Sequence, residues 1–403
     1  MHRDFLKIGR ASASSGTRRI AVIIAATALL MSGTVIGWSI GSGAAGAAPA
    51  PGVGAGAPAA SAVSRIGGGG VDSYADVVEE VAPAVVTIRA ERRLTRTSQG
   101  MPDDPWFREF FGPRFQVPDP GPRRERGLGS GVIVRPDGYI LTNHHVIDGA
   151  TAVKVELTDG RTFDARVVGS DAPSDLAVLR IDGDNLATLA LADSDAVRVG
   201  DVVLAVGNPL GVGQTVTLGI VSAKGRATGL GDGSYEDFIQ TDAPINRGNS
   251  GGALVSTRGE LIGINSQILS PSGGNIGIGF AIPSNMARHV MTQLIERGEV
   301  RRGLLGVTVQ PVTSDIARSL GLDSVHGALV NTVQPGGPAD KAGVRSGDVI
   351  TAINGTPVKD GNMLRNEVAQ LAPGTEATIA VFRDGRTRTL TATLAELERR
   401  SLN

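Results

Sequence analysis

Three short segments of this chain carry side chains that could together do nucleophilic chemistry. His145 follows an apolar run, Asp175 precedes one, and Ser250 lies among glycines. A serine hydroxyl becomes a good nucleophile when a histidine removes its proton, and a carboxylate can hold that histidine in one tautomer and stabilise its charge. These residue types predict acyl transfer through a covalent intermediate, if the fold brings them together.

The glycines beside Ser250 have a role of their own in this chemistry. Gly248 and Gly251 permit a tight backbone turn, because glycine adopts positive φ angles at little cost. Such a turn can point several N–H groups at one place, where the loss of one donor to an oxyanion costs about 3 kcal/mol in other enzymes. We expect the N–H groups of Gly248, Asn249 and Ser250 to form this oxyanion hole.

Each segment taken alone is a weak signal. A single histidine is usually structural, and a Gly-x-Ser-x-Gly segment also occurs in α/β-hydrolases, for which His326 could supply the later histidine. That fold needs a helix directly after the serine. Here two apolar runs, 253–255 and 261–264, follow Ser250 and indicate strands. An esterase of the α/β-hydrolase class is therefore the less favoured alternative.

Composition excludes several other kinds of chemistry. The chain has no cysteine, which rules out disulfides, thiol nucleophiles and thiolate metal sites. Its five histidines show no metal-ligand spacing, and no phosphate-binding loop pattern occurs. The formal net charge is -1, with no basic stripe for nucleic acid. We therefore predict no metal, no cofactor, no nucleotide use and no nucleic acid partner.

The amino-terminal part predicts attachment to a membrane. A basic segment, 1–19, precedes the uncharged stretch 20–40, which is long enough as a helix to cross a bilayer. The positive charges should stay in the cytoplasm, so the rest of the chain is exported. Cleavage of a signal peptide near 45–47 is the alternative, and it also exports the chain. Residues 41–72 are rich in Ala, Gly, Pro and Ser and predict a flexible linker.

Residues 73–298 predict a mainly β domain. After a short helix near 73–81, apolar runs of strand length alternate with turn signals, without helices between them. This spacing favours an antiparallel sandwich or barrel. A helix over 286–297, which ends at Gly298, closes the domain.

Residues 299–398 predict a smaller α+β unit, and 399–403 a short tail. Here segments in which the apolar residues have strand-like spacing alternate with segments in which they have helical spacing. The predicted strands are 305–310, 328–333, 348–353, 377–382 and 388–392, and the predicted helices are 315–320, 338–342 and 361–371.

The segments around the candidate residues resemble the active-site blocks of HtrA/Deg serine proteases. The resemblance covers about 74–394, nearly all of the exported part. It implies a chymotrypsin-like double β-barrel protease domain followed by a PDZ domain, and the chain order His, Asp, Ser is that of chymotrypsin-type enzymes. The matching motifs are Thr142-Asn143-His144-His145-Val146, Ser174-Asp175-Leu176-Ala177, Ala205-Val206-Gly207-Asn208-Pro209-Leu210-Gly211, Gln240-Thr241-Asp242-Ala243-Pro244-Ile245-Asn246, Gly248-Asn249-Ser250-Gly251-Gly252-Ala253-Leu254 and Ile276-Gly277-Ile278-Gly279-Phe280-Ala281-Ile282-Pro283.

The resemblance also selects among neighbouring candidates. It implies that His145 is the general base and Asp175 the orienting acid. His144 is then a bystander, because neighbouring side chains in an extended chain cannot both face one site. Asp171 is then a turn residue.

Substrate recognition is implied by the resemblance too. Residues 276–282 match the strand that pairs with an extended substrate. Ile245 and Ile278 match the positions that line the pocket for the residue before the cleaved bond, which implies a small or medium aliphatic side chain there. No acidic residue is placed to select lysine or arginine.

The smaller unit resembles the PDZ domain of these proteases. The segment 327–355 and the loop Arg302-Gly303-Leu304-Leu305-Gly306-Val307 carry this resemblance. The loop matches the one that binds a peptide carboxylate, so we expect contacts to a peptide C-terminus from Leu304, Leu305, Gly306 and Val307. Leu305 and Val307 could equally begin a buried strand.

Together these features predict a membrane-anchored, ATP-independent serine endopeptidase on the periplasmic or extracellular side of the cell envelope. It would cleave unfolded or signalling proteins in quality control or a stress response, and peptide binding at the PDZ domain would regulate it. The family implies a homotrimer, with the region of Tyr74 and the aromatic-rich loop 94–126 as candidate contacts. An inactive peptide-binding scaffold or chaperone is the alternative.

Overall fold

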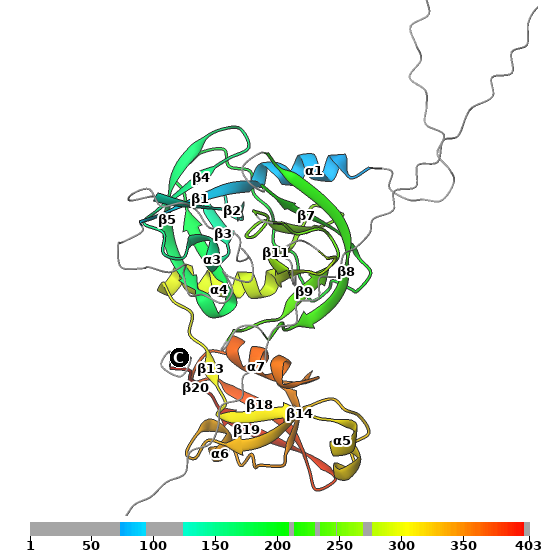
Figure 1. Ribbon diagram of the computed structural model, residues 1–403. Coiled ribbons are helices and arrows are strands. Elements are labelled where there is room, and N and C mark those ends of the chain that lie inside the picture. The colour runs from blue at the N-terminus through cyan, green and yellow to red at the C-terminus, as the bar shows by residue number, and fades with distance from the viewer. Residues whose placement is uncertain are drawn as a thin grey trace, which may run out of the picture. The chain divides into compact units, whose positions relative to one another are not determined.

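The computed structural model describes residues 73–93, 124–208, 213–229, 234–246, 248–268 and 276–398 (Figure 1). The predicted membrane segment, the linker after it and most of the loop 94–126 lie outside these residues. Within the described ranges, none of the helices has both the length and the apolar character needed to cross a membrane.

The first barrel is a closed sheet of antiparallel strands in the order β1-β2-β3-β6-β5-β4. Its interior is filled by fully buried β-branched and leucine side chains such as Ile88, Ile140 and Leu179. A hairpin joins β2 to β3, with Val132 opposite Leu141. The strands are β1 (Val85–Arg93), β2 (Arg124–Ile133), β3 (Tyr139–Thr142), β4 (Ala152–Glu156), β5 (Thr162–Asp171) and β6 (Leu176–Arg180).

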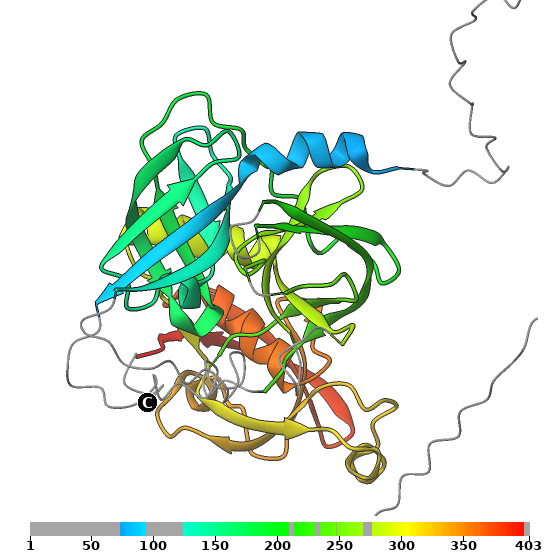
Figure 2. The ribbon, with the colours of Figure 1, turned by 45° about the horizontal axis from the view of Figure 1, so that its top comes forward.

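The second barrel is closed in the same way, in the order β10-β11-β12-β9-β8-β7. Figure 2 shows the two barrels side by side. A shared core, which includes Leu141 and Leu176 from the first barrel and Val206 and Ile264 from the second, joins them. The strands are β7 (Val202–Gly207), β8 (Thr215–Arg226), β9 (Phe238–Thr241), β10 (Ala253–Ser256), β11 (Leu261–Ile268) and β12 (Gly279–Pro283).

Two helices complete this part of the chain. Helix α1 (Ala75–Val81) continues through a 3₁₀ turn, η1 (Ala82–Ala84), into β1. Helix α4 (Ser284–Arg297) buries Met286, Val290 and Leu294, whose spacing of four residues puts them on one face against the shared core. The predicted stop is confirmed: Gly298 has φ +74°, and its N–H donates to the Leu294 carbonyl.

The smaller unit is built on a sheet in the order β14-β15-β16-β18-β19, with β17 beside β16, and on a two-stranded pair of β13 with β20. Strand β14 therefore lies at an edge of its sheet. The elements are β13 (Gly303–Leu304), β14 (Val307–Pro311), α5 (Ser314–Leu320), β15 (Ala328–Val333), α6 (Pro338–Lys341), β16 (Val349–Ile353), β17 (Thr356–Pro357), α7 (Gly361–Gln370), β18 (Glu376–Arg383), β19 (Arg386–Thr393) and β20 (Ala395–Glu396).

Two local expectations were wrong. The beginning of the predicted strand 305–310 was placed too early: it is found as β14, which begins only at Val307, because Gly306 before it has φ +79°. The two adjacent histidines do not lie in an extended chain but in a one-turn helix, α3 (His144–Ile147). Neighbouring side chains on a helix point about 100° apart, so the helix separates them without an extended backbone.

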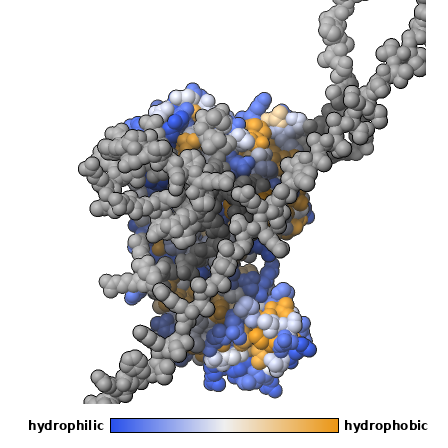
Figure 3. All heavy atoms as spheres, viewed as in Figure 1, coloured by the Kyte–Doolittle hydropathy of each residue, from blue (hydrophilic) through white to orange (hydrophobic). Residues whose placement is uncertain are grey.

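The surface carries few exposed large apolar side chains among the described residues. On the face seen in Figure 3, apolar residues form small patches among polar ones. Leu218 and Ile220, which lie on one face of β8, are 53% and 40% exposed. Scattered side chains of this kind are normal for a folded surface.

Candidate active site

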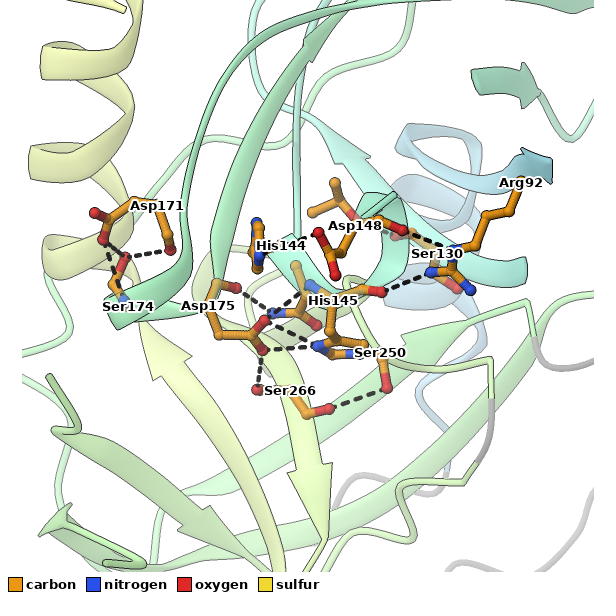
Figure 4. Close-up of polar contacts among 12 residues, drawn as sticks. Arg92, Ser130, His144, His145, Asp148, Asp171, Ser174, Asp175, Ser250 and Ser266 are labelled. Carbon is orange, nitrogen blue, oxygen red and sulfur yellow. Dashed lines mark hydrogen bonds and ion pairs between the residues drawn. The ribbon is translucent and has the colours of Figure 1, made fainter. Parts of the chain in front are cut away.

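His145 is presented by α3, directly after strand β3. Arg92 on β1 fixes the carboxyl end of this short helix: its Nε donates to the Asp148 carbonyl at 2.6 Å and its Nη2 to the His145 carbonyl at 3.2 Å. His144 points elsewhere, and its Nε2 lies 3.8 Å from Asp148 Oδ1 (Figure 4). The short helix therefore directs only one of the two histidines toward Asp175.

The imidazole of His145 meets the carboxylate of Asp175 directly. His145 Nδ1 lies 2.9 Å from both Asp175 Oδ1 and Oδ2 (Figure 4). The backbone N–H of His145 also donates to Oδ1 at 3.1 Å. The Asp175 carbonyl accepts from the His144 N–H at 3.1 Å and from the Asn143 side-chain amide at 3.0 Å. The beginning of α3 is thus bound to Asp175 through both its backbone and its side chain.

Asp175 follows a 3₁₀ turn, η2 (Ala172–Ser174), and has left-handed backbone angles, φ +52° and ψ +39°. Burial alone would raise the pKa of its carboxyl group. The charge of His145 and hydrogen bonds from His145 and Ser266 outweigh burial and hold this pKa below its usual value. The carboxylate is therefore ionised at neutral pH and can stabilise an imidazolium.

Ser250 lies in a tight turn between the barrels. Gly248 and Gly251 have φ of +94° and +81°. A Cβ at Gly251 would overlap the Ser130 carbonyl oxygen and the Thr142 hydroxyl, so glycine is needed there for space as well as for conformation. Ser130 on β2 holds the turn: its N–H donates to the Ser250 carbonyl at 2.8 Å and its hydroxyl to the Gly248 carbonyl at 2.5 Å.

Ser266 on β11 links the serine to the carboxylate. Its carbonyl accepts from Ser250 Oγ at 3.0 Å, and its hydroxyl donates to Asp175 Oδ2 at 2.9 Å (Figure 4). The structure thus brings His145, Asp175 and Ser250, which are far apart in the sequence, into one polar cluster at the junction of the two barrels.

The backbone donors around Ser250 differ in their partners. The N–H of Asn249 donates to the Asn246 carbonyl at 3.0 Å and so closes the turn itself. The N–H groups of Gly248 and Ser250 belong to the same turn, whose glycines have positive φ. In this conformation the Asn249 N–H is bonded within the turn and does not point at a ligand position.

The two predicted pocket residues differ in exposure. Ile245 is fully buried, whereas Ile278 is half-buried just before β12. Gly279, the first residue of β12, lies against Ile245: a Cβ at this glycine would be 2.9 Å from Ile245 Cδ1. The space next to β12 therefore depends on this glycine.

The predicted peptide loop of the smaller unit lies between β13 and β14. The Leu305 carbonyl accepts from the Ala339 N–H and the Gly306 carbonyl from the Gln334 N–H, both at 2.9 Å. The Leu305 side chain is buried in the core of this unit, whereas Leu304 and Val307 are half-buried. Leu305 could therefore meet a ligand only through its backbone.

Sequence reasoning missed three residues of the site. Arg92, Ser130 and Ser266 hold the histidine helix, the serine turn and the carboxylate, respectively. Ser130 stands between Gly129 and Gly131, which is a weak sign of close backbone packing. Among the described residues, no group of three His, Cys, Asp or Glu side chains is arranged to hold a metal ion.

Comparison with known proteins agrees with this geometry. Residues 129–264 match the trypsin-like peptidase domain and residues 303–394 the PDZ domain. The chain is 50% identical over 324 residues to the periplasmic pH-dependent serine endoprotease DegQ of Escherichia coli strain K12, across 80% of this chain and 70% of that protein. It is 48% identical over 336 residues to the periplasmic serine endoprotease DegP of the same strain, across 78% of this chain and 70% of that protein.

A solved structure is similar over the same region. The HtrA-type protease AlgW with a tripeptide has a TM-score of 0.65 and 46% identity, and the match covers 81% of this chain and 98% of that chain. A trypsin-like double barrel followed by a PDZ domain defines the class, a serine endopeptidase with a peptide-binding module. The chain belongs to the HtrA family of serine proteases. The predicted enzyme class and mainly β fold are thereby confirmed.

Proposed function

We propose that Ser250 is the nucleophile of this protease, His145 its general base and Asp175 the carboxylate that orients the base. The observation that carries the proposal is the contact of His145 Nδ1 with both carboxylate oxygens at 2.9 Å. Because an ionised carboxylate can only accept hydrogen bonds, Nδ1 is the donor in this contact, and in the neutral imidazole Nε2 is then the acceptor for the serine hydroxyl proton. To react, Ser250 Oγ exchanges its bond to the Ser266 carbonyl for one to Nε2.

The reaction then follows from these positions. Ser250 Oγ attacks the carbonyl carbon of the substrate while His145 takes the hydroxyl proton. We propose that the N–H groups of Gly248 and Ser250 receive the oxyanion, with Asn249 joining them only if its bond to Asn246 opens. His145 next gives its proton to the leaving amine as the peptide C–N bond breaks, which leaves the acyl-enzyme. Water then attacks the acyl-enzyme in the same way, with His145 again as the base, and releases Ser250.

The test is Ser250→Ala in the full chain. Casein cleavage should fall by about a thousandfold or more, because removal of one triad member abolishes the covalent route. Labelling of the wild type by a fluorophosphonate should be lost in the variant, while binding of a peptide to the PDZ domain persists. Full proteolysis by Ser250→Ala would contradict the proposal. Absence of both cleavage and labelling in the wild type would favour the scaffold alternative.

Substrate selection rests on the half-buried Ile278 and the fully buried Ile245 beside Gly279. We propose that these residues form the wall and the floor of an apolar pocket that accepts Val, Ala or Leu before the cleaved bond. Cleavage-site profiling of cell-envelope proteins with wild type and Ser250→Ala should give such residues at that position. An enrichment of lysine or arginine there would contradict the pocket assignment.

We also propose that the PDZ domain binds peptide C-termini along β14. As an edge strand, β14 can add a peptide strand through its backbone. The loop Leu304, Leu305, Gly306 and Val307 would hold the terminal carboxylate through its N–H groups. A fluorescent peptide with a free C-terminus should bind, and the same peptide with an amidated C-terminus should bind much more weakly. Equal affinities would contradict this mode.

Location and assembly are proposed from the sequence and the relatives. The two similar E. coli proteases are described as periplasmic, so we propose an extracytoplasmic protease, anchored through residues 20–40 and acting on unfolded or signalling proteins. Alkaline carbonate extraction of membranes should leave the full chain in the pellet and release a chain lacking 1–40. A homotrimer, with contacts near Tyr74 and in the loop 94–126, should be seen by analytical ultracentrifugation.

A further inference from the structure

The turn that carries Asp175 is bound to an arginine far away in the sequence. Arg302 Nη1 lies 2.8 Å from Asp171 Oδ1, and Arg302 Nη2 lies 2.5 Å from Asp171 Oδ2, which makes a bidentate ion pair. The two side chains are only 9% and 8% exposed. Asp171 is the last residue of β5 and pairs with Leu176, the first residue of β6, so the loop between them is 172–175.

Asp171 uses its carboxylate to hold this loop. Besides Arg302, Oδ2 accepts from the Ser174 N–H at 3.1 Å and from the Ser174 hydroxyl at 2.5 Å (Figure 4). Asp175, the next residue, has the left-handed backbone conformation described above. L-residues keep that conformation only when the surrounding structure determines it. The Asp175 N–H donates to the Ala172 carbonyl at 3.0 Å, and Asp171 holds the residue before it, Ser174. The turn therefore adds its own constraints on Asp175 to those from the beginning of α3.

Arg302 touches the same loop by a second route. Its guanidinium lies over the ring of Tyr235, 4.4 Å from the ring centre, and the Tyr235 N–H donates to the Pro173 carbonyl at 2.6 Å. The arginine is therefore connected to the loop 172–175 twice, through Asp171 and through Tyr235. Arg302 lies outside both matched regions, which end at 264 and begin at 303.

A buried ion pair is a poor source of stability. The loss of hydration of both charges offsets most of their attraction, and apolar residues of similar volume often serve as well. Such a pair does impose one arrangement on its surroundings, because either partner alone is costly to bury. Without Arg302, the buried Asp171 carboxylate lacks its charged partner and should turn toward water, which releases Ser174.

We propose that Arg302 is a positioning residue for proteolysis. Its ion pair with Asp171 holds the 171–175 turn, and the turn holds the Asp175 carboxylate against His145. The inference rests on the proposed role of Asp175. Arg302 touches neither the substrate nor the reacting atoms, and it acts only through the geometry of Asp175.

The test compares Arg302→Met with Arg301→Met in the full chain. Arg301 is the matched control, because it is the neighbouring residue and forms an exposed ion pair with Glu396. With a short peptide substrate, Arg302→Met should lower kcat at least tenfold and change KM less than twofold. The acid limb of its pH profile should move to lower pH, because the imidazolium loses part of its stabilisation by the carboxylate. Arg301→Met should match the wild type.

A fluorophosphonate titration of active sites separates positioning from folding. If Arg302→Met only reduces the fraction of active sites, with wild-type kcat per labelled site and a wild-type pH profile, the proposal is overturned. If this variant does not fold, Arg302→Lys and Asp171→Asn take its place, and wild-type kcat and pH profiles in both would overturn the proposal. Ser250→Ala in the same assay separates the proposed nucleophile from the proposed role of Arg302. Residual activity of Ser250→Ala refutes the proposed nucleophile. An inactive Ser250→Ala together with a normal Arg302→Met refutes only the role of Arg302.

Discussion

The hydroxyl of Ser266 donates to Asp175 Oδ2 at 2.9 Å, while its carbonyl accepts from the hydroxyl of Ser250 at 3.0 Å. One residue of β11 thus contacts both the proposed acid and the proposed nucleophile. The side-chain bond fills one acceptor position of the carboxylate and leaves its remaining capacity for His145. The carbonyl bond keeps the serine hydroxyl in the site before substrate arrives.

Ser266→Ala removes the first of these two bonds and keeps the second. A hydrogen bond to a charged group contributes about 1.5–3 kcal/mol, so we expect kcat to fall by about tenfold or more with little change in KM. Kinetics on a peptide substrate measure this effect. Ser256→Ala, at the end of β10, is the control and should keep wild-type kcat, whereas equal activity in both variants would contradict the role of Ser266.

Gly251→Ala should disrupt the nucleophile turn. The added Cβ would overlap the Ser130 carbonyl oxygen and would sit on a residue with φ +81°. A displacement of the turn by about 1 Å is enough to lower activity by about a hundredfold. Gly160→Ala is matched in backbone conformation, with φ +85°, but has no atom within 4 Å of its Cβ. It should cost only about 1 kcal/mol of stability and leave the activity unchanged.

Asp237, just before β9, should make stability depend on pH near 6. Burial raises the pKa of its carboxyl to about 6, the charges of Asp195, Glu367 and Asp360 raise it too, and Lys224 opposes them. This pKa lies above the unfolded value of about 3.8, so the contribution of the group is full below about pH 4 and is lost as pH rises through 6. Asp237→Asn should therefore gain about 1–3 kcal/mol at pH 8.

Melting temperatures measured from pH 4.5 to 8 check this sign. The difference between Asp237→Asn and the wild type should grow with pH and level off above about 7. Asp164→Asn is the control, because the Asp164 side chain is 86% exposed. A constant difference across the range would show that the carboxyl does not titrate there.

The PDZ domain contains its own buried ion pair. Arg383 Nε lies 2.6 Å from Asp348 Oδ1, and its Nη2 lies 2.7 Å from Oδ2, with side chains 11% and 1% exposed. Removal of one partner of a buried pair costs about 3–5 kcal/mol, so Arg383→Met should weaken peptide binding by destabilising this domain. Arg388→Met, which breaks the exposed contact with Asp384, should change stability by less than about 0.5 kcal/mol.

Thermal unfolding and binding of a fluorescent peptide test this prediction on the full chain. Arg383→Met should lower both the melting temperature of the PDZ domain and its affinity, whereas Arg388→Met should alter neither. Wild-type stability of Arg383→Met would mean that the apolar side chain fills the space of the ion pair as well as the arginine does.

Most elements could be predicted because their signals are local. Apolar runs of strand length, separated by turn signals, predicted the mainly β domain, and Gly298 predicted the end of α4. The helix α3 escaped prediction, since its single turn is too short to show a helical period. Its conformation depends on bonds to Asp175 and Arg92, which lie 30 and 53 positions away from His145 in the sequence.

The sequence by itself determined the residue types of the proposed site, because His145, Asp175 and the glycines around Ser250 each lie in a short motif with its own chemical reason. Only the tertiary structure decided what holds them. Ser266 is 91 positions from Asp175, and Arg302 is 131 positions from Asp171. No local pattern marks such partners. Their contacts follow from how the two barrels and the segment after α4 pack together. Buried charges and hydroxyls are tolerated there because each one has a hydrogen-bond partner.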